Sequence, residues 1–253
     1  MERIDKKPRI RLAGRVFAFI AILTALMFSA SFILMPKNNT EAGGMENPNE
    51  HGFYGEPENT IDIAVIGNSD AYSGISPLEL WNHHGYTTYV AGEGSQALSQ
   101  SVIMLEKMLK NQKPKLVLLE TDAVFSGLPH NTLVSIVKNK MPLFQYHDRW
   151  KSVKAEDMFR KPHYNNKTVT KGQYVSTEVV PYTGPEYMIE GTSKKQIPLY
   201  SKYSLTSLWK YVKKMIYSFC WSMFRPINPG PMKSIIQYKA MLMKRVFHML
   251  IWI

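Results

Sequence analysis

The ten residues IDIAVIGNSD, residues 61–70, join an apolar run to the turn Gly-Asn-Ser-Asp. The apolar run predicts a buried β-strand that ends at Gly67. A serine directly after such a strand, on a tight turn, lies where open α/β sheets bind their ligands. Ser69 is therefore a candidate nucleophile. The competing interpretation is that residues 68–70 are ordinary polar turn residues.

Strands and helices alternate after this stretch. Ser76 and Glu79 predict the start of a helix that ends at Gly85. We further expect strands over residues 86–90, 116–120 and 174–180, and helices over residues 97–111, 131–140 and 204–217. The short links between the first three strands predict an α/β fold, a three-layer, doubly wound parallel sheet with right-handed crossovers.

The loops that follow the three strands are expected to meet. The carboxyl ends of parallel strands lie at one edge of a sheet, which is where ligands bind in this class of fold. The loops carry Ser69, then Gly92 and Gly94 with Ser95, and then Asp122. One crevice is therefore expected to hold a serine, a glycine-rich turn and a polar side chain.

The N-terminal part predicts a membrane anchor. Residues 1–15 hold six Lys and Arg, and residues 16–35 are an apolar run without a charge. About 20 apolar residues span a bilayer as a helix, and a basic flank keeps its end in the cytoplasm. A cleaved signal peptide is the alternative. We expect a single-pass signal anchor in the cell membrane, with the domain outside the cytoplasm.

Residues 36–59 are rich in Asn, Gly, Glu and Pro, which predicts a linker between the anchor and a domain over residues 60–214. The formal net charge of +11 is concentrated at the ends of the chain, because residues 191–253 add eleven basic residues and no acid. The middle of the chain is slightly negative, which argues against a nucleic-acid partner. The single cysteine, Cys220, excludes an intrachain disulfide. No cofactor motif and no metal-ligand cluster is present in the sequence.

The strand-end motifs resemble a known family. Residues 67–70, the turn over residues 92–96 and Glu-Thr-Asp at residues 120–122 are similar to the first three blocks of the SGNH (GDSL-type) hydrolase superfamily, in particular its bacterial membrane-anchored members. The likeness covers roughly residues 53–214. It implies an SGNH/flavodoxin-like sheet and a serine esterase or acyltransferase that acts on acyl esters of a cell-envelope glycan.

The resemblance also implies roles for individual residues. Ser69 matches the nucleophile, Gly92, Gly94 and Ser95 match the oxyanion region, and Asp122 matches the third-block position, where the family often has asparagine. Further candidates for substrate contacts are Asn68, Asp70, His147 and Arg149.

The family's catalytic base does not match. It is a histidine preceded by an aspartate near the C-terminus, and this chain has no carboxylate after Glu190. Because a serine without a base is a weak nucleophile, we expect little or no activity. The alternative is a non-catalytic, membrane-anchored binding or interaction module.

The basic tail over residues 215–253 lacks the apolar strand that the fold needs next. A shifted reading frame from about codon 214 can encode the strand-like sequence NDIQLLLVNVPS. We therefore hypothesise a frameshift, which sequencing of the coding DNA tests, and an incomplete domain. The alternative is a native tail that lies on an anionic membrane surface.

Overall fold

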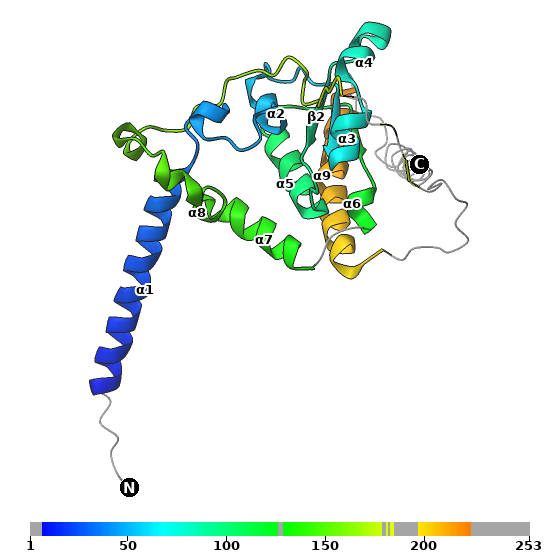
Figure 1. Cartoon of the computed structure of the whole chain (residues 1–253). Coiled ribbons are helices and arrows are strands. Elements are labelled where there is room, and N and C mark those ends of the chain that lie inside the picture. The colour runs from blue at the N-terminus through cyan, green and yellow to red at the C-terminus, as the bar shows by residue number, and fades with distance from the viewer. Residues whose placement is uncertain (1–6, 126–128, 179–180, 182, 185–196, 224–253) are drawn as a thin grey trace. The chain divides into compact units, whose positions relative to one another are not determined.

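The computed structural model describes residues 7–125, 129–178, 181, 183–184 and 197–223. The chain divides into two compact units, Met1–Tyr211 and Val212–Ile253. Figure 1 shows the elements of the first unit. Its strands are β1 (Ile63–Gly67), β2 (Thr88–Gly92) and β3 (Leu116–Leu119). Its α-helices are α1 (Lys7–Leu34), α2 (Pro48–His51), α3 (Ser69–Gly74), α4 (Pro77–His84), α5 (Leu98–Met108), α6 (Asp122–Phe125), α7 (Pro129–Lys140) and α8 (Pro142–Gln145). Its 3-10 helices are η1 (Glu41–Gly43), η2 (Gly52–Gly55), η3 (His147–Lys151) and η4 (Ala155–Met158), and α9 (Leu199–Met223) begins in this unit and ends in the second.

The three strands form a parallel sheet in the order β2-β1-β3. In this register Val65 of the central strand lies opposite Val90 and Leu118. All five residues of β1 are buried, as expected for an apolar strand with neighbours on both sides. The predicted α/β class with a parallel sheet is confirmed.

Helices cover the sheet on both faces. Ile63 and Val65 pack with Ala71 of α3 in one cluster. The residues between them, Ala64 and Ile66, point to the opposite face and are also fully buried. The helix α5 contacts β1 and β2, and Figure 1 shows α3 and α5 on opposite sides of β2. The apolar core therefore lies in two layers, one on each side of the sheet.

Helix α4 follows its sequence signals closely. Ser76 accepts a hydrogen bond from the backbone N–H of Glu79, at 3.4 Å, and Pro77 occupies the first turn. Gly85 ends the helix in the left-handed conformation, with φ +70°. The carboxylate of Glu79 contacts His83 at 3.0 Å.

The outer edge of β2 is covered by a loop. The backbone N–H of Val90 donates to the carbonyl of Lys171 at 3.0 Å. A Cβ on the next residue, Gly172, would lie 1.8 Å from the Val90 carbonyl oxygen, and Gly172 has φ +89°. Only glycine fits here, because both the contact and the backbone conformation exclude a side chain.

The strand predicted over residues 174–180 is wrong within the described residues 174–178, which form no strand. Tyr174 makes a single backbone hydrogen bond, to the carbonyl of Tyr72 at 2.9 Å, and its side chain is exposed. The β-branched composition of this segment indicated a strand, but no strand of the described residues pairs with it. Residues 179 and 180 lie outside the described residues.

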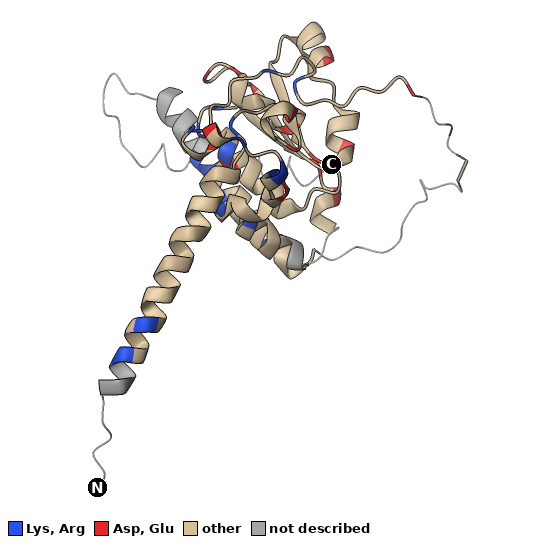
Figure 2. Ribbon diagram, turned by 60° about the vertical axis from the view of Figure 1, so that its left-hand side comes forward, with Lys and Arg blue, Asp and Glu red and all other residues tan. Residues whose placement is uncertain are grey.

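Helix α1 is apolar over most of its length. Its stretch Arg11–Leu34, 24 residues with mean hydropathy 2.4, is long and apolar enough to cross a membrane, a test that a signal sequence also passes. Large apolar side chains such as Phe17, Phe19 and Leu26 are exposed along it. Figure 2 shows basic residues only at its start, followed by an uncharged stretch.

Residues 36–59 do not form the predicted linker. They contain α2, η1 and η2, and several of their side chains are buried in the first unit, among them Lys37, Asn39, Met45, Glu50, His51 and Phe53. The amide of Asn39 donates to the carbonyls of His51 and Asn166, at 3.1 and 2.8 Å. The polar residues and glycines of this segment form helix caps and tight turns instead. Thr40, for example, caps η1, and Gly44 ends it in the left-handed conformation.

The helix predicted over residues 204–217 lies within the longer α9. Leu205 packs against the cluster of Leu98, Ala123 and Val124, which joins α9 to α5 and α6. The predicted aberrant tail over residues 215–253 falls on the end of α9 and on residues 224–253, which lie outside the described residues.

Candidate functional site

The loops after the three strands meet at one edge of the sheet. A Cβ on Gly67, at the end of β1, would lie 2.4 Å from the Cβ of Glu120, which follows β3. A Cβ on Gly92, at the end of β2, would lie 3.2 Å from the Asn68 carbonyl oxygen. Both glycines therefore allow the loops to approach closely. The expected convergence of the three strand ends is confirmed.

Asn68 holds this edge together. It is buried and caps α3, where its Oδ1 accepts from the backbone N–H of Asp70 at 3.0 Å. Its Nδ2 donates to Oδ2 of Asp122 at 3.0 Å. The sequence predicted Asn68 as a substrate contact, but both ends of its amide are occupied. Its role in the structure is to connect the loops after β1 and β3.

Ser69 is the first residue of α3 and is half-buried, one residue after the buried cap. Its Oγ makes no hydrogen bond to a histidine or carboxylate among the residues that the structure describes. Asp70, beside it, is exposed. The position suits a nucleophile at a strand end, and the surroundings supply it with no base from the described part of the chain.

The loop after β2 has its left-handed residue at a serine. Ser95 has φ +56°, whereas Gly92 and Gly94 have no positive φ. Ser95 and Gly94 are exposed, and the ring of Tyr72 lies beside both glycines. The residue with a left-handed backbone in this turn is thus Ser95, and neither of the two glycines.

Glu120 is a site residue that the sequence reasoning missed. The backbone N–H of Asn68 donates to its Oε2 at 3.4 Å, and that of Asp122 donates to its Oε1. Its position directly after the apolar strand β3 is the sequence signal that could have identified it. Glu120 and Asp122 thus both contact Asn68, the residue before Ser69, and carboxylates at this edge of the sheet disfavour a developing oxyanion.

A buried polar cluster lies behind the second loop. Glu50 and His51 are 2% and 4% exposed, and the amide of Asn47 donates to the carboxylate of Glu93, the residue after β2. Burial, with Glu93 nearby, raises the pKa of Glu50 to about 8. Burial lowers the pKa of His51 to about 4, and burial also raises the pKa of Glu93.

Glu50 and His51 are therefore a neutral pair at neutral pH, although Glu50 Oε2 lies 3.6 Å from His51 Nδ1. His51 Nδ1 is 3.0 Å from the Asn47 carbonyl, to which a neutral ring donates. Oε1 of Glu50 has no hydrogen-bond partner among the described atoms. The sequence did not point to this cluster, because residues 36–59 had the composition of a linker.

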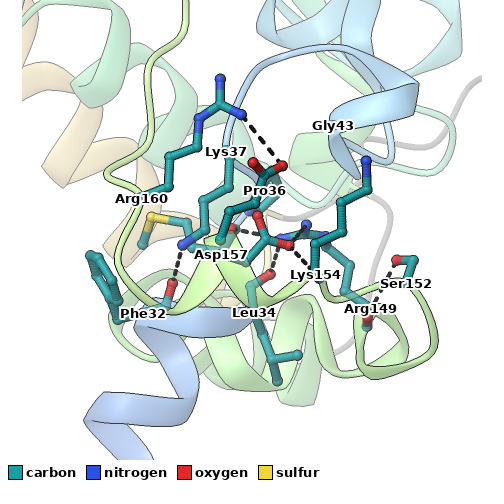
Figure 3. Close-up of polar contacts among 12 residues, drawn as sticks. Phe32, Leu34, Pro36, Lys37, Gly43, Arg149, Ser152, Lys154, Asp157 and Arg160 are labelled. Carbon is teal, nitrogen blue, oxygen red and sulfur yellow. Dashed lines mark hydrogen bonds and ion pairs between the residues drawn. The ribbon is translucent and has the colours of Figure 1, made fainter.

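His147 and Arg149 lie elsewhere, at the end of α1. Figure 3 shows the Arg149 guanidinium beside α1, where its Nη1 donates to the carbonyls of Leu34 and Met35, at 2.8 and 2.7 Å. Its Nη2 lies 3.3 Å from the Asp157 carboxylate. His147 is exposed and contacts only Asp148, at 3.6 Å, among the described residues. Arg149 therefore supports the end of α1 and does not lie near Ser69 as a substrate contact.

Comparison with family models, curated proteins and solved structures finds no match for this chain. Within the described residues, no group of three or more His, Cys, Asp or Glu could hold a metal ion. The function of the site is therefore inferred from the geometry and chemistry of its residues.

Proposed function

We propose that this chain is a membrane-anchored, extracytoplasmic protein with an SGNH-type acyl-ester site, in which Ser69 occupies the nucleophile position. The observation that carries the proposal is the place of Ser69, first residue of α3 directly after β1, beside the loops of β2 and β3. An ester-linked acyl group of a cell-envelope glycan is the proposed substrate class.

The finer fold belongs to the same proposal. The order β2-β1-β3, with helices on both faces, supports a doubly wound sheet in which further strands would continue beyond β3. β3 is less protected than its neighbours, since Leu116 is 39% exposed and the other three residues are only partly buried. This partial exposure supports the proposal that, among the described residues, the sheet lacks a strand beside the outer edge of β3, which agrees with the frameshift hypothesis.

The chemistry favours binding over turnover in this chain. Acyl transfer from an ester needs a base that takes the proton from Ser69 and donors that stabilise the oxyanion. Among the described residues, Glu120 and Asp122 contact Asn68, the residue before Ser69, and no histidine is hydrogen-bonded to the Ser69 hydroxyl. We therefore propose that the site retains the architecture of a hydrolase and lacks its activity.

The test is an esterase assay on the full chain in detergent, with p-nitrophenyl acetate as the substrate. We expect the same rate for the parent chain and for Ser69→Ala. Ser73→Ala, an exposed serine on the same helix, serves as the matched control. Hydrolysis that is lost in Ser69→Ala but kept in Ser73→Ala would overturn the proposed inactivity and support a working nucleophile.

A non-catalytic binding module is the second candidate. The bond of Asn68 to Asp122 favours it, because it joins the loops after β1 and β3 into a pre-formed edge, on which the exposed Asp122 can bind a ligand without any covalent step. Binding of an acetylated oligosaccharide to the full chain, measured by calorimetry, separates the two. Equal affinity in the parent chain and Ser69→Ala, without release of acetate, supports the binding module.

A further inference from the structure

Helix α7 presents an apolar face to the outside. Leu133, Val134, Ile136 and Val137 are 66%, 45%, 38% and 45% exposed. Their spacing places them on one side of a helix. The less exposed residues Thr132, Ser135 and Asn139 form another stripe, and α7 contacts α5. The polarity of this helix is thus the reverse of that expected for a helix on a water-exposed surface.

This apolar face begins beside the membrane anchor. α7 leads into α8, and α8 packs against the last turns of α1, where the Leu143 N–H donates to Ser31 Oγ at 3.2 Å. Figure 1 shows α8 at the end of α1 that meets the domain, with α7 extending from it. α8 therefore connects α7 to the end of the apolar helix α1.

Two further segments at the same end of α1 expose apolar side chains. η3 and η4 both contact α1, and they carry Trp150, Met158 and Phe159, which are 68%, 52% and 87% exposed. Phe159 directly follows η4. Tryptophan is typical of the boundary between lipid and water, where one end of the ring is apolar and the other is wet.

The surroundings are positively charged. Residues 129–167 contain eight Lys and Arg and three Asp and Glu. The buried Arg149–Asp157 pair accounts for one charge of each sign, and the remaining charges lie mostly on exposed side chains. Figure 2 shows basic residues gathered where α1 meets the domain. Such a surface complements the anionic headgroups of a membrane.

The contacts in Figure 3 fix the position of η3 and η4 at the end of α1. Arg149 in η3 donates to the carbonyls of Leu34, the last residue of α1, and of Met35, and it pairs with Asp157 in η4. Lys37 Nζ donates back to the Phe32 carbonyl at 2.7 Å and lies over the Phe32 ring. Because α1, η3 and η4 are joined in this way, a membrane that holds α1 meets the exposed residues of η3 and η4.

We propose that the apolar face of α7, together with Trp150, Met158 and Phe159, lies on the bilayer surface on the domain side of α1, with the surrounding lysines on anionic lipid headgroups. The occupant of this surface is the lipid itself. An amphipathic helix in this position would bury its apolar face at the boundary between headgroups and acyl chains. The inference rests on α1 as a membrane span and is independent of the chemistry proposed for Ser69.

The test places a polarity-sensitive fluorophore on single cysteines of the full chain. In a Cys220→Ser background, Val137→Cys reports on α7, Leu23→Cys on α1 and Glu58→Cys on an exposed site of the domain. Each protein is reconstituted in vesicles of phosphatidylcholine and phosphatidylglycerol, with and without brominated acyl chains. We expect brominated lipid to quench the labels at Leu23 and Val137 and to leave the label at Glu58 bright.

Each outcome decides a different point. A label at Val137 that stays bright in brominated lipid, while the label at Leu23 is quenched, overturns the surface proposal and leaves the span intact. If the Val137 label is also shielded from aqueous iodide, a second copy of the chain covers α7 instead of lipid. A Leu23 label that stays bright overturns the span itself, and the proposal for α7 with it.

Discussion

Replacement of Glu50 by glutamine should change how the stability of this protein depends on pH. Burial raises the pKa of Glu50 from an ordinary value of 4.5 to about 8, and it lowers the pKa of His51 from 6.5 to about 4. Between pH 4.5 and 6.5 the unfolded chain holds a proton on His51, and the folded chain holds one on Glu50. The two states bind equal numbers of protons on this pair, so its contribution to stability is flat there.

Above pH 6.5 the balance changes. The unfolded chain has lost both protons, while the folded chain keeps the one on Glu50 until its pKa of about 8. Stability therefore falls as the pH rises through this window, by about 1.4 kcal/mol per pH unit, or about 2 kcal/mol in all. In a chain of this size that lowers the melting temperature by roughly 4 to 8 °C.

The variant Glu50→Gln keeps the size of the side chain and removes this proton. Its stability should rise from about pH 4 to 6.5, where the neutral His51 is favoured, and then stay level to pH 8. Thermal melts of the full chain in detergent, followed by tryptophan fluorescence at a series of pH values, measure both profiles. Glu58→Gln, at an exposed glutamate, is the matched control. Parallel profiles for the parent chain and Glu50→Gln between pH 6.5 and 8 would refute the reasoning.

Two further substitutions test the supports of the fold. Arg149→Ala leaves the carboxylate of Asp157 buried without its partner and should cost about 3 to 5 kcal/mol in unfolding free energy, measured by urea denaturation, whereas the exposed Arg160→Ala should cost about 0.5 kcal/mol or less. Equal costs would contradict the assigned support of α1. Gly172→Ala should destabilise by about 2 kcal/mol or more, because its Cβ would meet the Val90 carbonyl at a positive φ, and Gly74→Ala, where nothing lies within 4 Å, should change stability by less than about 0.5 kcal/mol in the same assay. A tolerated Gly172→Ala would show that this loop does not hold the edge of β2.

Local signals predicted the elements that position Ser69. The apolar run that ends at Gly67 indicated β1, and the residues before the glycine-rich turn at Gly92 indicated β2. Ser76 and Gly85 indicated the bounds of α4. These predictions succeeded because burial of a regular apolar pattern and the satisfaction of helix ends are decided within a few residues. Parallel pairing then brought the strand ends to one edge, as the order of elements implied.

Predictions that depended on distant partners failed. Residues 36–59 had the composition of a linker, yet Asn39 bonds to Asn166, 127 residues away, and Glu50 is buried. Residues 174–178 had the composition of a strand, but no described strand lies beside them. Arg149 looked like a ligand contact and instead binds the carbonyls of Leu34 and Met35. None of these partners leaves a trace in the local pattern.

The sequence by itself determined the parallel α/β core, the apolar N-terminal helix and the place of Ser69 after β1. Each of these follows from the periodicity of apolar residues and from the conformational needs of glycine and of helix caps. Only the tertiary structure decided that Asn68 is bonded to Asp122, that Glu50 is buried, and that Arg149 supports α1. The physical reason is that a polar group must find a partner once it leaves water, and which partner it finds depends on the packing of segments far apart in the chain.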